Sequence, residues 1–274
     1  MTETQRKRAV SRDGTEIYYE TYLQDGQKPQ LLFVHGVGGD LDAWQFILRP
    51  VLAAGYGSMA LDLRGSGYSG HPRGLKSYAM ERMTEDILSV IEAEELEKVT
   101  VIGHSGGAVC SLAFALAHPD KINKLILLSP SYAPPRYGRS KALRALYAPF
   151  ITALALISPK ARKPWHSPYP RGKHHQEVEV YGLARTIYKN SLASYLLISK
   201  TLIHIDFEGA LPEVNLPTLL VAGEKDGIYP ASVAGVMREK MPDATLKVIP
   251  GANHVLPLNN PKEVAEAILQ FLRG

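Results

Sequence analysis

The stretch Val99-Thr100-Val101-Ile102-Gly103-His104-Ser105-Gly106-Gly107 joins a short apolar run to a serine flanked by glycines. The run predicts a strand buried on both faces, and helical spacing begins at Val109 and Leu112. A serine on a tight strand-to-helix turn stands clear of the backbone, and its flanking glycines let the crossing chains pass each other. The helix N-terminus beside it favours developing negative charge. A bare G-x-S-x-G is a weak signal, so it is this context that predicts a nucleophile at Ser105.

Apolar and β-rich runs recur on both sides of this stretch and alternate with segments of helical spacing. The expected strands are Thr15–Leu23, Leu31–Val34, Val99–Ile102, Leu125–Leu128, Thr218–Val221 and Thr245–Ile249. The expected helices are Trp44–Leu52, Met80–Ile91, Val109–Leu116 and Val264–Leu272. Strands that alternate with crossover helices predict an α/β fold with a doubly wound, mostly parallel sheet.

One long segment interrupts this alternation. Residues 131–212 contain no convincing strand, and they carry twelve basic and four acidic residues, a net charge of +8, whereas the rest of the chain is at −4. The change in composition predicts a helical insert, or lid, over the main sheet. We therefore expect residues 1–130 and 213–274 to form the core domain and residues 131–212 to form the lid.

A serine nucleophile needs a base, and the base needs a carboxylate to orient it. Among nine histidines, His254 follows a β-rich run and precedes the last helix, so it is expected at the carboxyl edge of the sheet. His104 is interpreted as a packing neighbour of the nucleophile. Asp226 directly follows the strand Thr218–Val221 and is the expected acid, with Glu224 as the alternative. The order Ser, Asp, His along the chain fits this arrangement.

The third requirement is a pair of backbone N–H groups for the oxyanion of the reaction. The glycine-rich segment His35-Gly36-Val37-Gly38-Gly39 follows the strand Leu31–Val34. We assign the two donors to the backbone amides of Val37 and Gly106, and His35 to a buried structural role behind this loop. A phosphate-binding loop is excluded because no G-K-[ST] follows the glycines.

Composition narrows the class of protein. The chain has 274 residues, of which 45% are hydrophobic and 21% charged, and its net charge of +4 is too small to indicate nucleic-acid binding. The single cysteine excludes an intramolecular disulfide. Residues 1–10 lack the apolar run of a secretory signal, and no apolar stretch is long enough to cross a bilayer. We therefore expect a soluble cytoplasmic protein.

Five motifs together resemble the α/β-hydrolase family, of the esterase, C–C hydrolase and haloperoxidase-like type with a helical lid. They are His35–Gly38, Asp62–Ser69, Gly103–Gly107, Gly223–Asp226 with Pro230, and Gly251–His254. The resemblance implies an eight-stranded sheet, no metal or organic cofactor, and a purely structural role for Asp62–Ser69. A serine at position 105 disfavours epoxide hydrolases and haloalkane dehalogenases, which use an aspartate there. Val255 disfavours plant hydroxynitrile lyases, which carry a lysine there.

These residues predict a serine hydrolase that cleaves an ester of a small or medium apolar substrate through an acyl-enzyme. Two enzymatic alternatives, hydrolysis of a C–C bond and of a lactone, use the same triad. A further alternative from another class is a small-molecule receptor that retains the triad, as plant hormone receptors of this fold do.

The lid contains an apolar segment, Ala142–Ile157, interrupted by Pro149 and followed by Lys160, Arg162, Lys163 and Trp165. We favour a lid helix that forms a wall of an apolar substrate pocket. The alternative adds weak, reversible contact of this basic cluster with an anionic membrane surface.

Overall fold

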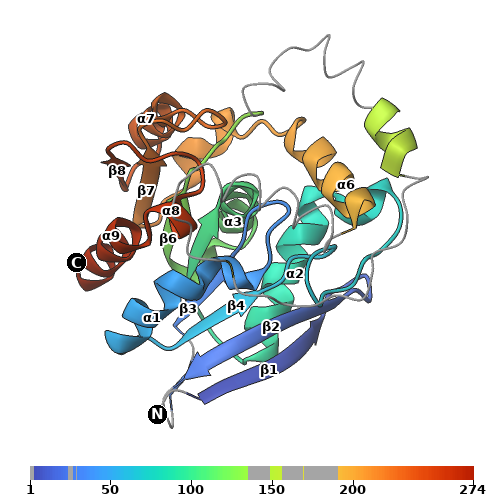
Figure 1. Ribbon diagram of the computed structural model, residues 1–274, viewed down its shortest axis with the longest axis horizontal. Coiled ribbons are helices and arrows are strands. Elements are labelled where there is room, and N and C mark those ends of the chain that lie inside the picture. Colours follow the sequence, from blue (N-terminus) through green and yellow to red (C-terminus); the bar gives the residue numbers. More distant parts are fainter. Residues whose placement is uncertain (1–2, 24–26, 29, 135–148, 156–168, 170–190) are drawn as a thin grey trace.

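The computed structural model describes residues 3–23, 27–28, 30–134, 149–155, 169 and 191–274. Within them one sheet of eight strands has the order β1-β2-β4-β3-β5-β6-β7-β8 (Figure 1). Only β2 runs antiparallel to its neighbours; the other adjacent strands pair in parallel. The strands are β1 Glu3–Val10, β2 Glu16–Leu23, β3 Leu31–Val34, β4 Ser58–Leu61, β5 Val99–His104, β6 Ile122–Leu128, β7 Thr218–Gly223 and β8 Ala244–Ile249.

Helices cover both faces of this sheet, as the alternation of the sequence predicts. They are α1 Gln45–Ala53, α2 Met80–Ala93, α3 Gly106–Ala117, α6 Leu192–Leu202, α7 Ala231–Lys240, α8 Leu256–Asn259 and α9 Pro261–Arg273. One apolar cluster lies between the sheet and α2, α3 and α7, and a second lies between the sheet and α1, α8 and α9. The predicted fold class, a doubly wound and mostly parallel α/β sheet, is confirmed.

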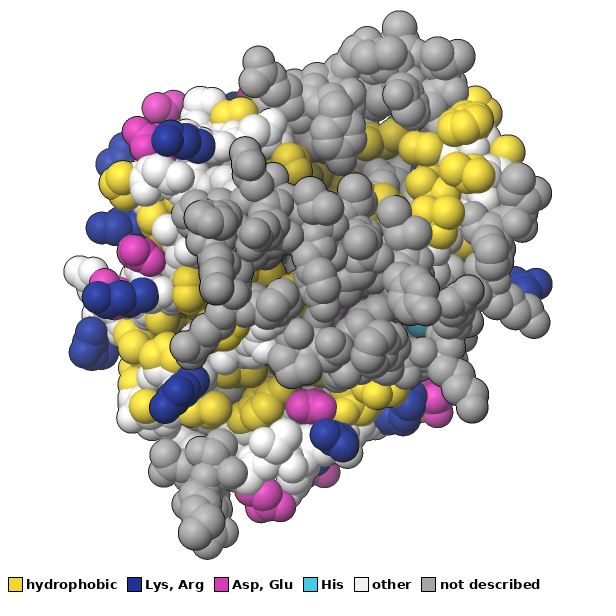
Figure 2. All heavy atoms as spheres, in the orientation of Figure 1, with side chains coloured by type: hydrophobic (Ala, Val, Ile, Leu, Met, Phe, Trp, Pro, Cys, Tyr) yellow, Lys and Arg dark blue, Asp and Glu magenta, His cyan; other side chains and the backbone are white. Residues whose placement is uncertain are grey.

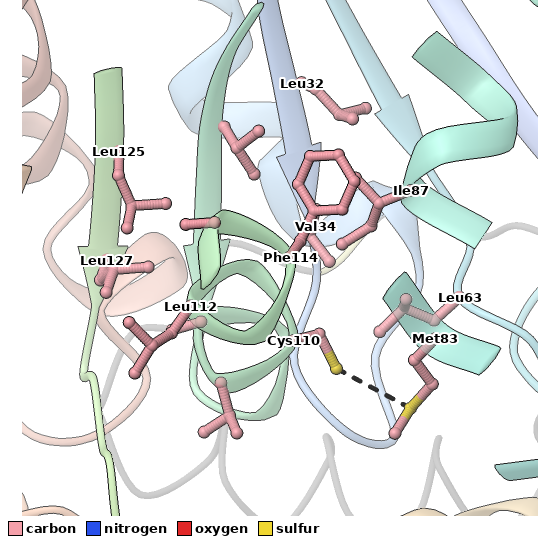
Figure 3. Packing of buried hydrophobic residues seen from close by; sticks show 14 of the residues in the cluster. Leu32, Val34, Leu63, Met83, Ile87, Cys110, Leu112, Phe114, Leu125 and Leu127 are labelled. Atoms are coloured by element: carbon pink, nitrogen blue, oxygen red, sulfur yellow. Dashed lines mark hydrogen bonds between the residues drawn. The ribbon is translucent and has the colours of Figure 1, made fainter. Parts of the chain in front are cut away.

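The central strands are apolar on both faces because each face is covered by helices. All four residues of β3 are buried, with Leu32 and Val34 in the first cluster and Leu31 and Phe33 in the second. Figure 3 shows Leu32 and Val34 packed against Phe114 of α3 and Ile87 of α2. Each Å² of apolar surface that such packing removes from water stabilises the fold by about 25 cal/mol. The buried contacts therefore hold α3 in a fixed position against the sheet.

The Asp62–Ser69 segment holds neighbouring loops together through buried polar groups. The carboxylate of Asp62 accepts hydrogen bonds from the backbone amides of Leu41 and Tyr68, at 2.8 and 2.9 Å. The fully buried guanidinium of Arg64 donates to both carboxylate oxygens of Asp86, at 2.6 and 2.7 Å. These contacts lie within the core and contribute no group to the cavity described below.

Part of the expected lid segment is described. Residues 149–155 are helical, and α6 is fixed to the core because Tyr78 and Ser194 share a hydrogen bond of 2.7 Å between their hydroxyls. Hydrophobic side chains gather where these two helices lie, at the upper right of Figure 2, and Phe150 is 64% exposed there. The cluster Lys160–Trp165 lies outside the described residues, and its contact with membranes stays a prediction. In the described part of the chain, no helix is long and apolar enough to cross a bilayer.

Candidate active site

Ser105 lies on a sharp turn between β5 and α3. Its backbone has φ 53° and ψ −120°, a conformation that costs a non-glycine residue free energy and must be maintained by its surroundings. The glycines on either side are required by close packing: a Cβ on Gly107 would overlap the carbonyl oxygens of Val34 and His35, and one on Gly103 would overlap α3. The turn therefore presents the Ser105 side chain at the carboxyl edge of the sheet.

His254 lies in the loop after β8 and reaches Ser105 directly. Its Nε2 lies 2.7 Å from Ser105 Oγ, and its Nδ1 lies 2.8 Å from Asp226 Oδ2. Because the carboxylate can only accept, Nδ1 carries the proton and Nε2 accepts the hydrogen bond of the serine hydroxyl. An imidazole held in this tautomer is able to take the hydroxyl proton as the oxygen attacks.

Asp226 follows β7 and is buried on the far side of His254. Its Oδ1 accepts from the backbone amides of Ile228 and Tyr229, each at 2.9 Å, so both carboxylate oxygens have fixed donors. Burial raises the pKa of the Asp226 carboxyl. The hydrogen bond and charge of His254, together with the two amides, outweigh that effect and hold the pKa below its ordinary value. Asp226 is therefore ionised at neutral pH.

Glu224, the alternative acid, lies apart from this arrangement. Its side chain is exposed, and its Oε2 accepts a hydrogen bond of 2.7 Å from the backbone amide of Gly251. This contact ties the loop after β7 to the loop after β8. The structure thus brings Ser105, His254 and Asp226 together and leaves Glu224 outside.

The backbone of Val37 lies beside the first turn of α3. A Cβ built on Gly106 would lie 3.4 Å from the backbone nitrogen of Val37, so the two amides predicted to bind the oxyanion are neighbours. As the first residue of α3, Gly106 has an N–H that the helix itself leaves without an acceptor. Behind this loop His35 is buried, and its Nε2 accepts from the amide of Leu63 at 3.0 Å.

A cavity of about 620 Å³ opens above Ser105. Its described walls come from the loop after β3, the loops after β7 and β8, and the helix α6, which contributes Tyr195, Ser199 and Leu202. Tyr169 adds a further wall and is held by Gln45, whose Nε2 donates to the Tyr169 carbonyl at 2.8 Å. The size is ordinary for a small-molecule site. The sequence did not predict that residues of α6 line the cavity. Residues nearly a hundred positions apart, such as Leu202 and Gly106, come into contact only in the folded chain, and such a contact leaves no pattern in the local sequence.

His104, interpreted from the sequence as a packing neighbour, has a more specific contact. Its Nε2 lies 2.9 Å from the backbone carbonyl oxygen of His254 and donates to it. Burial, with a smaller contribution from the charge of His254, lowers the pKa of His104 to about 3. The side chain is therefore neutral at every pH at which the protein is expected to work.

The depressed pKa of His104 predicts a pH-dependent loss of stability. Between about pH 6.5 and 3 the unfolded chain binds a proton at this residue that the folded chain does not, so the free energy of unfolding falls as the pH falls. From pH 6.5 to 4.5 the wild-type protein should lose roughly 2 kcal/mol more than His104→Gln, which keeps a donor but does not titrate. Urea unfolding of both proteins at the two pH values measures this difference, and equal losses would contradict it.

No cluster of three or more His, Cys, Asp or Glu side chains able to hold a metal ion occurs among the residues that the structure places. The groups assembled at Ser105 are a hydroxyl, an imidazole, a carboxylate and two backbone amides.

Comparison with known proteins agrees with this fold. The family model described as alpha/beta hydrolase fold matches residues 29–261. Epoxide hydrolase 3 of Xenopus tropicalis is 26% identical over 92% of this chain and 74% of its own length, and the strigolactone esterase of Arabidopsis thaliana is 25% identical over 90% and 92%. The solved structure of a thermophilic esterase from Thermogutta terrifontis is 25% identical, with a TM-score of 0.79 over 98% of each chain. The chain belongs to the α/β-hydrolase fold family.

Proposed function

We propose that this hydrolase cleaves a carboxylic ester of a small or medium apolar substrate through an acyl-enzyme on Ser105. The observation that carries the proposal is the pair of hydrogen bonds, 2.7 and 2.8 Å long, that connects Ser105 through His254 to Asp226 at the base of the cavity. The esterases among the relatives support the same bond type. The epoxide hydrolase relative does not carry over its reaction, because the enzymes of that type use an aspartate where this chain has Ser105.

In the first step Ser105 Oγ attacks the ester carbonyl carbon while His254 Nε2 accepts the hydroxyl proton. The carbonyl oxygen becomes an oxyanion and accepts hydrogen bonds from the amides of Val37 and Gly106. The C–O bond to the alcohol then breaks, and the imidazolium returns the proton to the leaving oxygen. Asp226 remains ionised throughout and stabilises the imidazolium.

In the second step a water molecule attacks the acyl carbon and gives its proton to His254 Nε2. The tetrahedral intermediate again forms its oxyanion beside Val37 and Gly106. When it collapses, the bond to Ser105 Oγ breaks, the serine recovers a proton from His254, and the carboxylic acid leaves. One water is consumed for each ester cleaved, and the protein returns to its starting state.

The test is steady-state hydrolysis of p-nitrophenyl acetate, butyrate and octanoate, with a five-membered lactone in parallel. We expect many turnovers per chain on the open-chain esters and a lower kcat/KM on the lactone. Release of only one equivalent of nitrophenol per chain would contradict hydrolysis of the acyl-enzyme and favour a receptor. A higher kcat/KM on the lactone would contradict the assignment to open-chain esters.

Leu202 is expected to limit the acyl groups that fit this site. Its Cδ1 lies 3.1 Å from the position of a Cβ on Gly106, and so directly beside one of the two predicted oxyanion donors. A methyl branch on the acyl carbon next to the ester carbonyl would clash with this methyl group. In Leu202→Ala, the ratio of kcat/KM for p-nitrophenyl isobutyrate to that for acetate should rise about tenfold, the effect of relieving a methyl-sized conflict.

Leu197 of the same helix gives a matched control. Both leucines are 6% exposed, but Leu197 does not line the cavity. Each substitution to alanine should destabilise the fold by about 2–5 kcal/mol, and only Leu202→Ala should change the isobutyrate-to-acetate ratio. Equal ratios in the two variants would show that Leu202 does not restrict the acyl group.

A further inference from the structure

We propose that His104 and Ser129 act as positioning residues which together hold the backbone carbonyl of His254 and so fix the imidazole against Ser105. This pair of side chains is called the carbonyl cradle below. The inference rests on the proposed function, since it concerns how the expected base is held in place.

The cradle consists of two donors that converge on one acceptor. His104 Nε2 lies 2.9 Å and Ser129 Oγ 3.1 Å from the carbonyl oxygen of His254. A backbone carbonyl has two lone pairs, so the two side chains satisfy its full capacity as an acceptor. The carbonyl belongs to the loop between β8 and α8, where it takes part in no strand or helix of its own.

Neighbouring strands hold the two donors rigidly. His104 is the last residue of β5, and Ser129 directly follows β6, whose Leu128 pairs with His104 in the sheet. The Ser129 amide donates to Val221 of β7 at 2.7 Å, and the Ser105 amide donates to Leu128 at 2.9 Å. The cradle therefore anchors the His254 carbonyl to the ends of β5 and β6, the two strands that also hold Ser105.

The backbone conformation of Ser129 is a second, independent observation that supports a role for its hydroxyl. It has φ 47°, in the left-handed region that glycine adopts at little cost, yet the residue is a fully buried serine. A glycine would fit that conformation with less strain but would remove the hydroxyl. Among the residues that the structure describes, the hydrogen bond of this hydroxyl goes to the His254 carbonyl.

The charge state of His104 suits a positioning role. The residue donates from Nε2 and stays neutral, so it does not repel the imidazolium that forms on His254 during the reaction. The two rings are close, with centroids 5.4 Å apart, and a positive charge on His104 would oppose that step strongly. Burial lowers the pKa of His104 to about 3, so this side chain is too weak a base to compete with His254 for the serine proton.

The test removes each donor separately and together. His104→Leu and Ser129→Ala should each lower kcat about two- to tenfold, the range for loss of one hydrogen bond, with KM nearly unchanged. The double variant should lose on the order of a hundredfold, because a base displaced by about 1 Å loses that much. His104→Gln places an amide donor where Nε2 stood, and it should recover most of the lost kcat.

Two controls separate positioning from general structural damage. Ser89→Ala removes another buried serine hydroxyl, which donates to the Asp86 carbonyl at 2.8 Å in α2, and it should leave kcat unchanged. Ser129→Gly relieves the backbone strain yet lacks the hydroxyl, so it should lose as much kcat as Ser129→Ala. Wild-type kcat in Ser129→Gly would overturn the role of the hydroxyl.

The rate at which a fluorophosphonate reacts with Ser105 gives a second readout that needs no ester turnover, and it should fall in parallel with kcat. A double variant within twofold of wild type in this rate overturns the cradle, while the proposed function stands if Ser105→Ala is inactive. Absence of ester hydrolysis in the wild type contradicts the proposed function, and the phosphonylation rates still decide for or against the cradle.

Discussion

Replacement of Ser105 by alanine is expected to lower kcat for ester hydrolysis by about 10⁴-fold or more, as for members of such triads in other enzymes. No other hydroxyl occupies the position 2.7 Å from His254 Nε2, among the residues that the structure describes, so the attacking atom is lost outright. The remaining rate would come from the oxyanion donors and from binding alone.

The fold should survive this change. The left-handed backbone conformation at φ 53° costs alanine about as much free energy as it costs serine. The substitution therefore removes only one hydrogen bond, which contributes about 1 kcal/mol to stability. Thermal unfolding and hydrolysis of p-nitrophenyl butyrate are to be measured on the same preparation, with Ser89→Ala as a control for loss of a buried serine hydroxyl. A folded Ser105→Ala protein that keeps more than a tenth of wild-type activity would refute the assignment of the nucleophile.

Asp226→Asn is expected to lower kcat by about 10³–10⁴-fold. Oδ1 of Asp226 accepts from two backbone amides, so the oxygen of the new carboxamide must take that place. Its NH₂ group then faces His254 Nδ1 and donates to it. The imidazole proton moves to Nε2, and that nitrogen is no longer able to accept the proton of Ser105.

Glu224→Gln is the matched control, because it neutralises a carboxylate two residues away. Glu224 binds the amide of Gly251 rather than the imidazole, and glutamine keeps an acceptor oxygen for that contact. The loss in kcat should stay below about tenfold. Measured kcat values in the reverse order would assign the acid to Glu224 and contradict the role given to Asp226.

The sheet could be predicted largely from the sequence because its central strands are buried on both faces. The predicted Leu31–Val34 coincides with β3, and the predicted Thr218–Val221 lies within β7. Two strands escaped prediction. β1 is an edge strand with mostly exposed residues and a basic centre, and β4 has only four residues, which is too short for a clear pattern.

The position of the candidate site could also be predicted, since Ser105, Asp226 and His254 each follow a recognisable strand. Contacts within the site could not be. No local pattern assigns a contact to Ser129, and its place directly after β6 is the signal that the sequence offers for a contact with the loop of His254. Leu202 and Gly106 meet only because α6 folds back over the sheet.

The most direct test of the central claim, that Ser105 is the nucleophile, is the site of covalent labelling by an alkyl fluorophosphonate. The protein is labelled in stages, and ester hydrolysis and the modified peptide are measured at each stage. We predict one phosphonyl group per chain, attached to Ser105, with activity lost in proportion to labelling and no label in Ser105→Ala. A label on another residue that abolishes activity, or full activity in a chain labelled at Ser105, would contradict the account.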